Sequence, residues 1–112
     1  MHLEETFVIP KNHVNFKAQP LISNQEDELL DCAIAFIKPN GGGPNPSHTH
    51  LHDHLFTVLA GEVEIHCDDK IILLKEGMSF RVKGTSLHSV WNKSNLESKV
   101  LGISLIQKDT IH

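Results

Sequence analysis

The sequence predicts an all-β domain, built as an antiparallel sandwich or barrel. Its apolar residues fall in short runs, and most of these runs are bounded by glycine, proline, asparagine or aspartate. Several runs alternate apolar and polar residues with the period of two that is typical of strands, and no stretch keeps a helical period over three turns. Eight or more short strands at close spacing favour this architecture, and 112 residues predict a single domain over 1–112.

The first half of the chain contains two short strands and one long one. Residues 1–20 hold small apolar groups separated by two prolines, which predicts two short strands and loops. Residues 23–28 are polar and acidic and are expected to form a loop or hairpin tip. The apolar run at 29–38 predicts a strand that crosses the domain. The segment Pro-Asn-Gly-Gly-Gly-Pro at 39–44 is expected to end that strand and to act as a linker.

The second half alternates strands with tight turns. Residues 62–67 alternate strictly, so Val63, Ile65 and Cys67 are expected to face the core and His66 the surface. Residues 78–82 also alternate, which places Phe80 and Arg81 on opposite faces without deciding which face is internal. Strands are predicted at 54–59, 62–67, 71–74, 78–82, 88–92 and 99–106.

A histidine-rich stretch stands out between these halves. Four of the nine histidines lie within seven residues, at His48, His50, His52 and His54. Neutral imidazole is the commonest protein ligand of divalent transition metals, and histidines at i and i+2 of a strand share one face. On one straight strand the outer two would be roughly 20 Å apart, whereas a metal–nitrogen bond is about 2.1 Å. Either some of these histidines have another role, or the chain folds back, for which 51–53 is the natural bend between a strand ending at His50 and one beginning at His54.

The spacing around this stretch resembles the first motif of the cupin family. Gly43 is followed after five residues by His48-Thr-His50, after three more by His54, and after six more by Gly61. Histidine stands where the family usually has glutamate.

The second cupin motif is similar to the segment from Gly77 to Asn92. His88 follows the glycine by eleven residues, and Asn92 follows His88 by four. Lys83 replaces the usual proline, and Gly84 lies one place earlier than the usual glycine. The two motifs together imply a small single-domain cupin of the cupin-2 type, with a cupin-type antiparallel jelly-roll barrel.

The resemblance implies a metal site. Its ligands would be His48, His50, His54 and His88, which leave one or two coordination positions open for chemistry. Nitrogen ligands suit zinc, nickel, iron(II) and copper, and the sequence leaves the choice among these divalent transition metals open. Four neutral histidines would leave the full charge of +2 on the ion, so we expect an anionic oxygen ligand.

Further residues are expected in or near the pocket. Phe56 and Val58 share the strand parity of His54, and Asn92 shares the parity of His88. His52 lies in the expected turn, where it is either a turn residue or a proton shuttle. Arg81 is the only guanidinium available to bind a carboxylate in bidentate fashion.

Charge and hydropathy limit the kinds of molecule that the protein is expected to bind. A net charge of −4 and a single arginine argue against nucleic acid. No apolar stretch approaches the roughly twenty residues that span a membrane, and the acidic N-terminus has no signal-peptide core, so we expect a cytoplasmic protein. Outward-facing Leu55 and Leu59, together with the resemblance, predict a homodimer.

Three functions follow from these patterns. The first is a metal-dependent enzyme, a dioxygenase, isomerase or lyase, acting on a small polar molecule, either neutral or anionic. The second is a non-catalytic module that binds or senses a metal or small ligand, and the third is a protein with a degenerate pocket. The sequence has no tyrosine, which argues against the His–Tyr acid–base pair of the sugar-nucleotide epimerases that share this superfold.

Overall fold

The chain folds into a curved antiparallel β-structure that nearly closes into a barrel. The computed structural model describes residues 6–22, 29–49 and 52–105, and these contain strands but no helix. The strands are β1 (Val14–Ile22), β2 (Leu29–His48), β3 (Asp53–Ala60), β4 (Glu62–Cys67), β5 (Lys70–Lys75), β6 (Ser79–Val82), β7 (His88–Trp91) and β8 (Ser98–Leu105). The expected all-β fold of jelly-roll type is confirmed.

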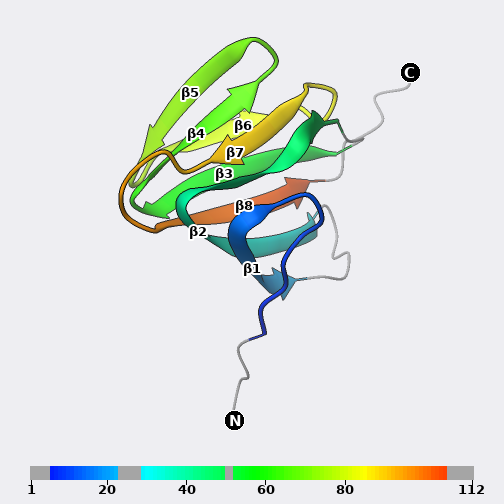
Figure 1. Ribbon diagram of the computed structural model, residues 1–112. Coiled ribbons are helices and arrows are strands. Elements are labelled where there is room, and N and C mark those ends of the chain that lie inside the picture. Colours follow the sequence, from blue (N-terminus) through cyan, green and yellow to red (C-terminus); the bar gives the residue numbers. More distant parts are fainter. Residues whose placement is uncertain (1–5, 23–28, 50–51, 106–112) are drawn as a thin grey trace, which may run out of the picture.

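Neighbours in the sheet are mostly distant in sequence. The strand order is β5-β4-β7-β2-β8-β3-β6, with β1 paired to β2 beside this path. Figure 1 shows the β4–β5 hairpin and β1 at opposite ends of the molecule, with β2, β3, β7 and β8 between them. The central strands therefore bring both histidine-bearing motifs into one region.

Strand β2 differs from the expectation that the Gly-Pro segment ends it. The strand runs on through that segment to His48, pairing first with β1 and β8 and then with β7. Asn40 has a φ of 64°, and Gly42 and Gly43 have φ values near 150°, so the backbone turns locally without leaving the sheet. A side chain at Gly42 would collide with the ring of Trp91, which explains why glycine is needed there.

The hydrophobic core lies between the inner strand faces. The expected inward face of β4 is confirmed, since Val63 and Ile65 are buried. For β6, whose inward face the sequence left open, the structure buries Val82, which is 1% exposed, and turns Arg81 outward. Burying side chains of this kind stabilises the fold by about 1.5–3 kcal/mol each. The buried core residues are Ile37, Val58, Val63, Ile65, Leu74, Val82, Val90 and Val100.

The segment before β1 folds back over one end of this core. Val8 and Ala18 exchange two backbone hydrogen bonds of 2.8 and 2.7 Å, and the amide of Asn45 donates to the carbonyl of Asn12 at 3.0 Å. The ring of His13 packs directly on Gly43, where an added Cβ would lie 2.8 Å from two ring carbons. The N-terminal segment is thus held against β2 next to the histidine-rich stretch.

Candidate functional site

Two of the predicted ligands, His54 and His88, meet from different strands. His54 is near the start of β3 and His88 begins β7, and their ring centroids are 5.1 Å apart with an interplanar angle of 63°. Two imidazoles bound to one ion through 2.1 Å bonds at tetrahedral or right angles have centroids about 4.5–5.2 Å apart. The spacing of these two rings fits a shared metal ion.

The orientation of both rings is supported by hydrogen bonds. His88 is 2% exposed, and its Nδ1 lies 2.9 Å from the carbonyl oxygen of Ser86. A carbonyl only accepts, so in the neutral ring Nδ1 carries the proton and Nε2 carries the lone pair that a metal requires. The Nδ1 of His54 lies 3.2 Å from the hydroxyl of Ser104, which can accept in the same way. Such outer contacts are typical of metal-binding histidines.

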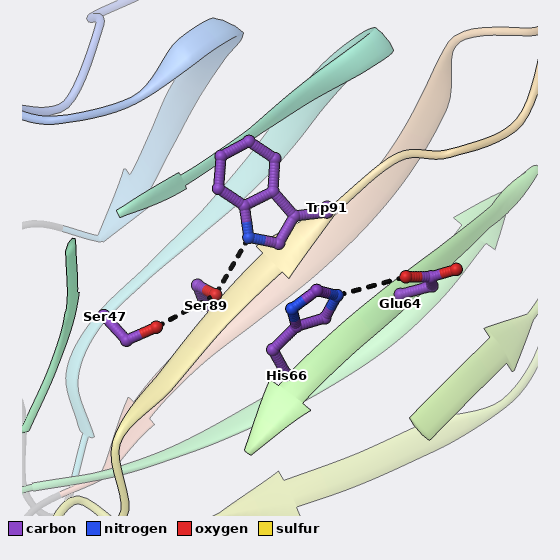
Figure 2. Close-up of polar contacts among 5 residues, drawn as sticks. All are labelled: Ser47, Glu64, His66, Ser89 and Trp91. Atoms are coloured by element: carbon purple, nitrogen blue, oxygen red, sulfur yellow. Dashed lines mark hydrogen bonds and ion pairs between the residues drawn. The ribbon is translucent and has the colours of Figure 1, made fainter. Parts of the chain in front are cut away.

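The other two predicted ligands are described only in part. The backbone of His48 pairs with His88 across β2 and β7, but its side chain and all of His50 lie outside the described residues. Just before it, the hydroxyl of Ser47 donates to that of Ser89 at 3.3 Å and so ties the end of β2 to β7 (Figure 2). In the described part of the chain, no three histidine, cysteine, aspartate or glutamate side chains are grouped to hold a metal ion.

Two predicted pocket residues are neighbours of Asp53, His52 along the chain and Arg81 through an ion pair. The ring of His52 is 4.8 Å from that of His54 in an edge-to-face arrangement. The side chain of Arg81 is 59% exposed and points to Asp53, donating to its Oδ2 from Nε at 3.2 Å and from Nη2 at 3.0 Å. The structure therefore places Arg81 in an ion pair on the outer face of β6.

Asp53 links the start of β3 to the loop that precedes His88. Its Oδ1 accepts the amide hydrogen of Gly84 at 3.0 Å. That hydrogen bond, opposed by burial and aided by Arg81, holds the pKa of the Asp53 carboxyl below its ordinary value. The same loop carries the Ser86 carbonyl that orients His88. Asp53 thus links the strand that carries His54 to the loop that orients His88.

A mostly apolar pocket adjoins the two histidines. One part, of about 180 Å³, is lined by His54, Phe56 and Ser104 and by small and aliphatic residues from β1, β2, β7 and β8. A second part, of about 220 Å³, is lined by His88, Gly43 and Pro44. The two parts share five lining residues: His13, Phe16, His54, Phe56 and Val90. The pocket is thus polar at the histidines and apolar elsewhere.

Phe56, Val58 and Asn92 occupy three different settings. The ring of Phe56 stacks on that of His54 with centroids 5.4 Å apart and lines both parts of the pocket. Val58 is 1% exposed within the core. Asn92 is fully buried, and its amide nitrogen donates to the carbonyls of Ile37 and Leu96, each at 2.8 Å. Asn92 thus orders the turn after β7.

His13 is a pocket residue that sequence reasoning missed. The sequence around it carries no metal or pocket motif, yet the ring is partly buried beside Phe16, with centroids 4.4 Å apart, and lines both parts of the pocket. Burial lowers the pKa of His13, and the hydrogen bond from its Nδ1 to the Lys11 carbonyl, 2.8 Å, partly offsets this. Ser104 was missed too, because the pairing of β3 with β8 that places it opposite His54 leaves no local signal in the sequence.

The outer face of β4 and β7 carries polar contacts that are separate from the pocket. His66 lies 3.1 Å from Glu64, and the indole of Trp91 donates to the hydroxyl of Ser89 at 2.9 Å (Figure 2). The strand register pairs Glu64 with Trp91 and His66 with Ser89, so all four side chains share this face. His66 is thus a histidine outside the candidate site, as the alternation of β4 predicts.

Comparisons with solved structures identify the fold. The chain is similar to a putative glyoxylate induced protein from Pseudomonas aeruginosa (13% identity, TM-score 0.82), covering 93% of this chain but only 40% of that one. A predicted oxalate decarboxylase from Thermotoga maritima is 18% identical with a TM-score of 0.78, covering 93% and 95% of the two chains. The cupin domain of an XRE family transcriptional regulator from Enterobacter cloacae is 18% identical with a TM-score of 0.75, covering 85% and 100%.

Sequence comparison identifies the family. A search of curated proteins found no match. The family model described as the cupin domain matches residues 34–104, which include both motifs from Gly43 to Asn92 and most of the barrel strands. The chain therefore belongs to the cupin family.

Proposed function

We propose that this protein is a metal-dependent cupin enzyme that acts on a small molecule. The observation that carries the proposal is the pair of rings, His54 and His88, which come from separate strands and lie 5.1 Å apart beside a pocket. The ligand set would be completed by His48 and His50. A zinc, nickel, iron or copper ion held there would supply a Lewis acid or redox centre for a dioxygenase, isomerase or lyase reaction.

The described residues have distinct parts in this proposal. His54 and His88 hold the ion through Nε2. The hydrogen bonds of their Nδ1 atoms, to the Ser104 hydroxyl and the Ser86 carbonyl, keep the two rings oriented. Phe56 excludes water on one side of His54. Since the ligands are neutral, an anionic oxygen of the substrate would offset the charge of the ion.

The metal content of the protein tests this proposal. Protein purified without a histidine tag or chelator is expected to contain about one transition-metal ion per chain by elemental mass spectrometry. The variants His48→Ala, His54→Ala and His88→Ala should lose it. His66→Ala is the matched control, because that ring pairs with Glu64 on the outer face, and it should retain the ion. An ion that persists in His88→Ala, or no ion after reconstitution of the parent, would overturn the proposal.

A second candidate function is ligand binding without turnover. It is favoured by the composition of the pocket part of about 180 Å³, in which the polar side chains from the described residues are only His13, His54 and Ser104. An enzyme with so few acid–base groups must rely on the ion, whereas a binding module needs none. Tight binding of a ligand that is recovered unchanged by the metal-loaded protein would favour this alternative.

The predicted homodimer and cytoplasmic location belong to the same proposal. None of the described segments forms a helix of the length and apolar character needed to span a membrane. Sedimentation velocity at micromolar concentration is expected to give a species of about twice the 12.5 kDa chain mass. A single species at the chain mass would contradict the dimer.

A further inference from the structure

The wall of the pocket beside His54 is unusually rich in small residues, and they lie next to one another. In the strand register Ala33 of β2 pairs with Gly102 of β8, and Gly102 pairs with Phe56 of β3. One step along, Ala35 of β2 pairs with Ala18 of β1. All five residues line the part of the pocket of about 180 Å³ that adjoins His54 and Ser104, which we call the chamber. The hollow therefore results from missing side-chain volume at adjacent positions.

The chamber has few polar side chains. On the strands these are His54 and Ser104, which are hydrogen-bonded to each other, and His13 adds a third from the segment before β1, whereas the remaining strand positions contribute aliphatic or phenyl groups. An apolar cavity of about 150 Å³ accommodates a benzene-sized molecule and holds water poorly. A small anion such as a dicarboxylate would occupy the histidine end and leave this volume unfilled.

Residues 10–16 form one side of the chamber. The rings of His13 and Phe16 are 4.4 Å apart, and both line the chamber and the part of the pocket near His88. His13 is in turn packed on Gly43. An apolar group that packs against these two rings is partly removed from water.

From these observations we infer that the ligand carries an apolar group, a phenyl ring or a chain of about four to six carbons, held among Ala33, Ala35, Phe56 and Gly102. Its polar head lies at the His54–His88 end, and this part of the inference rests on the proposed metal site. The ligand class is then an aryl or alkyl carboxylate or a related oxyanion, in place of the small polar molecule expected from the sequence.

Gly102 offers a way to fill the chamber without disturbing the fold. An added Cβ would lie 3.5 Å from Phe56 Cε1 and 3.9 Å from the Ala33 carbonyl oxygen, which are ordinary contacts. Valine suits a strand, so Gly102→Val should fold and remove much of the space, with Gly102→Ala as the milder change. Leu101→Val is the matched control, because it places the same side chain on the same strand at a position that does not line the chamber.

The first measurement uses fluorobenzene as a neutral probe, with binding followed by ¹⁹F NMR in the presence of chelator. Fluorobenzene should bind the parent, Leu101→Val and His88→Ala. Its affinity should fall about tenfold or more in Gly102→Val, with a smaller loss in Gly102→Ala. Circular dichroism and thermal melting establish that each variant is folded. Absence of fluorobenzene binding to the parent, or equal affinity in folded Gly102→Val, would overturn the inference.

The second measurement uses the metal-loaded protein and the series acetate, butanoate and hexanoate, titrated by calorimetry. Affinity should rise about fourfold for each methylene buried, and this rise should vanish in Gly102→Val. Equal affinities along the series would contradict the inference. The two proposals fail separately. If the protein binds fluorobenzene but takes up no metal, the apolar ligand site stands and the metal site is overturned. If it takes up metal but does not bind fluorobenzene, the metal site stands and the apolar ligand site is overturned.

Discussion

The ring of His54 is oriented by two neighbours that differ in chemistry. Phe56 stacks on it with an interplanar angle of 17°, and the hydroxyl of Ser104 lies 3.2 Å from its Nδ1. Stacking restricts the ring plane, while the hydroxyl holds Nδ1 in a hydrogen bond and so fixes the rotation of the ring within that plane. The hydroxyl contact is the one that a single substitution can remove without creating a large cavity.

We therefore expect Ser104→Ala to fold normally and to bind metal about 10–100-fold more weakly, because His54 loses the partner that orients it. Competition with a chromogenic chelator measures the change. Ser79→Ala removes a hydroxyl of the same kind that bonds Thr57 on the outer face, and it should leave metal affinity unchanged. An affinity in Ser104→Ala equal to that of the parent would show that Phe56 alone sets the ring.

His13 makes stability depend on pH. Burial lowers its pKa in the folded chain, whereas in the unfolded chain the pKa is about 6.5. Between these two values the unfolded state binds the proton and the folded state does not, so the free energy of unfolding falls as the pH drops below about 6.5 and is constant with respect to this group above it.

Urea unfolding at pH 7.5 and 5.5 tests this residue. The parent is expected to lose more stability than His13→Gln over the interval, because glutamine does not titrate. His66→Gln changes a histidine of the outer face and serves as the comparison. Identical losses in the parent and His13→Gln would mean that the burial of His13 has no effect on folding.

At the scale of elements, the connection between β3 and the β6–β7 loop determines how the two motifs meet. Asp53, 8% exposed, joins them by accepting from Gly84 on one oxygen and from Arg81 on the other. The two contacts differ in exposure: the Gly84 amide is buried, whereas the Arg81 side chain is largely in solvent. A buried amide that loses its acceptor costs more than an exposed ion pair that is broken.

Asp53→Ala should consequently lower the free energy of unfolding by about 1–3 kcal/mol, since the Gly84 amide is left without its acceptor. Arg81→Ala should cost about 0–1 kcal/mol, because its ion pair is exposed and screened by water. Both are measured by urea denaturation with unchanged m-values. Equal losses in the two variants would place the stabilisation in the ion pair and not in the loop contact.

At the scale of the whole molecule, the proposed metal site would join strands that are separate in sequence. His54 belongs to β3 and His88 to β7, and in the sheet order β2 and β8 lie between them. An ion bound only by the folded arrangement stabilises that arrangement by mass action, by about 2.7 kcal/mol at a free concentration one hundred times its dissociation constant. Global stability should therefore report on the site.

Chelation of the metal-loaded protein is expected to lower its melting temperature by about 10 °C or more, given a shift of about 4 °C or more per kcal/mol in small domains. Differential scanning calorimetry with and without a chelator measures this. His88→Ala should melt at the same temperature in both conditions. A chelator effect of equal size in that variant would locate the bound ion outside the barrel.

Much of the fold could be predicted from the sequence because the signals are local. Alternation of apolar and polar residues in 62–67 and 78–82 predicted the strands β4 and β6, each with its apolar residues on one face. The spacing of the two motifs predicted the cupin barrel. The segment 39–44 was misjudged as a linker, because glycine and proline usually end strands. Here the same residues let β2 turn and continue alongside β7.

The sequence by itself determined the all-β class, the family and the candidate histidines, since periodicity and motif spacing are written along the chain. Only the tertiary structure decided which side chains share the pocket. It directed Arg81 outward to Asp53, brought Ser104 to His54, and made His13 part of the chamber wall. These outcomes depend on the register between strands distant in sequence and on the path of the N-terminal segment, and pairing of that kind is set by packing across the whole barrel and not by any local pattern.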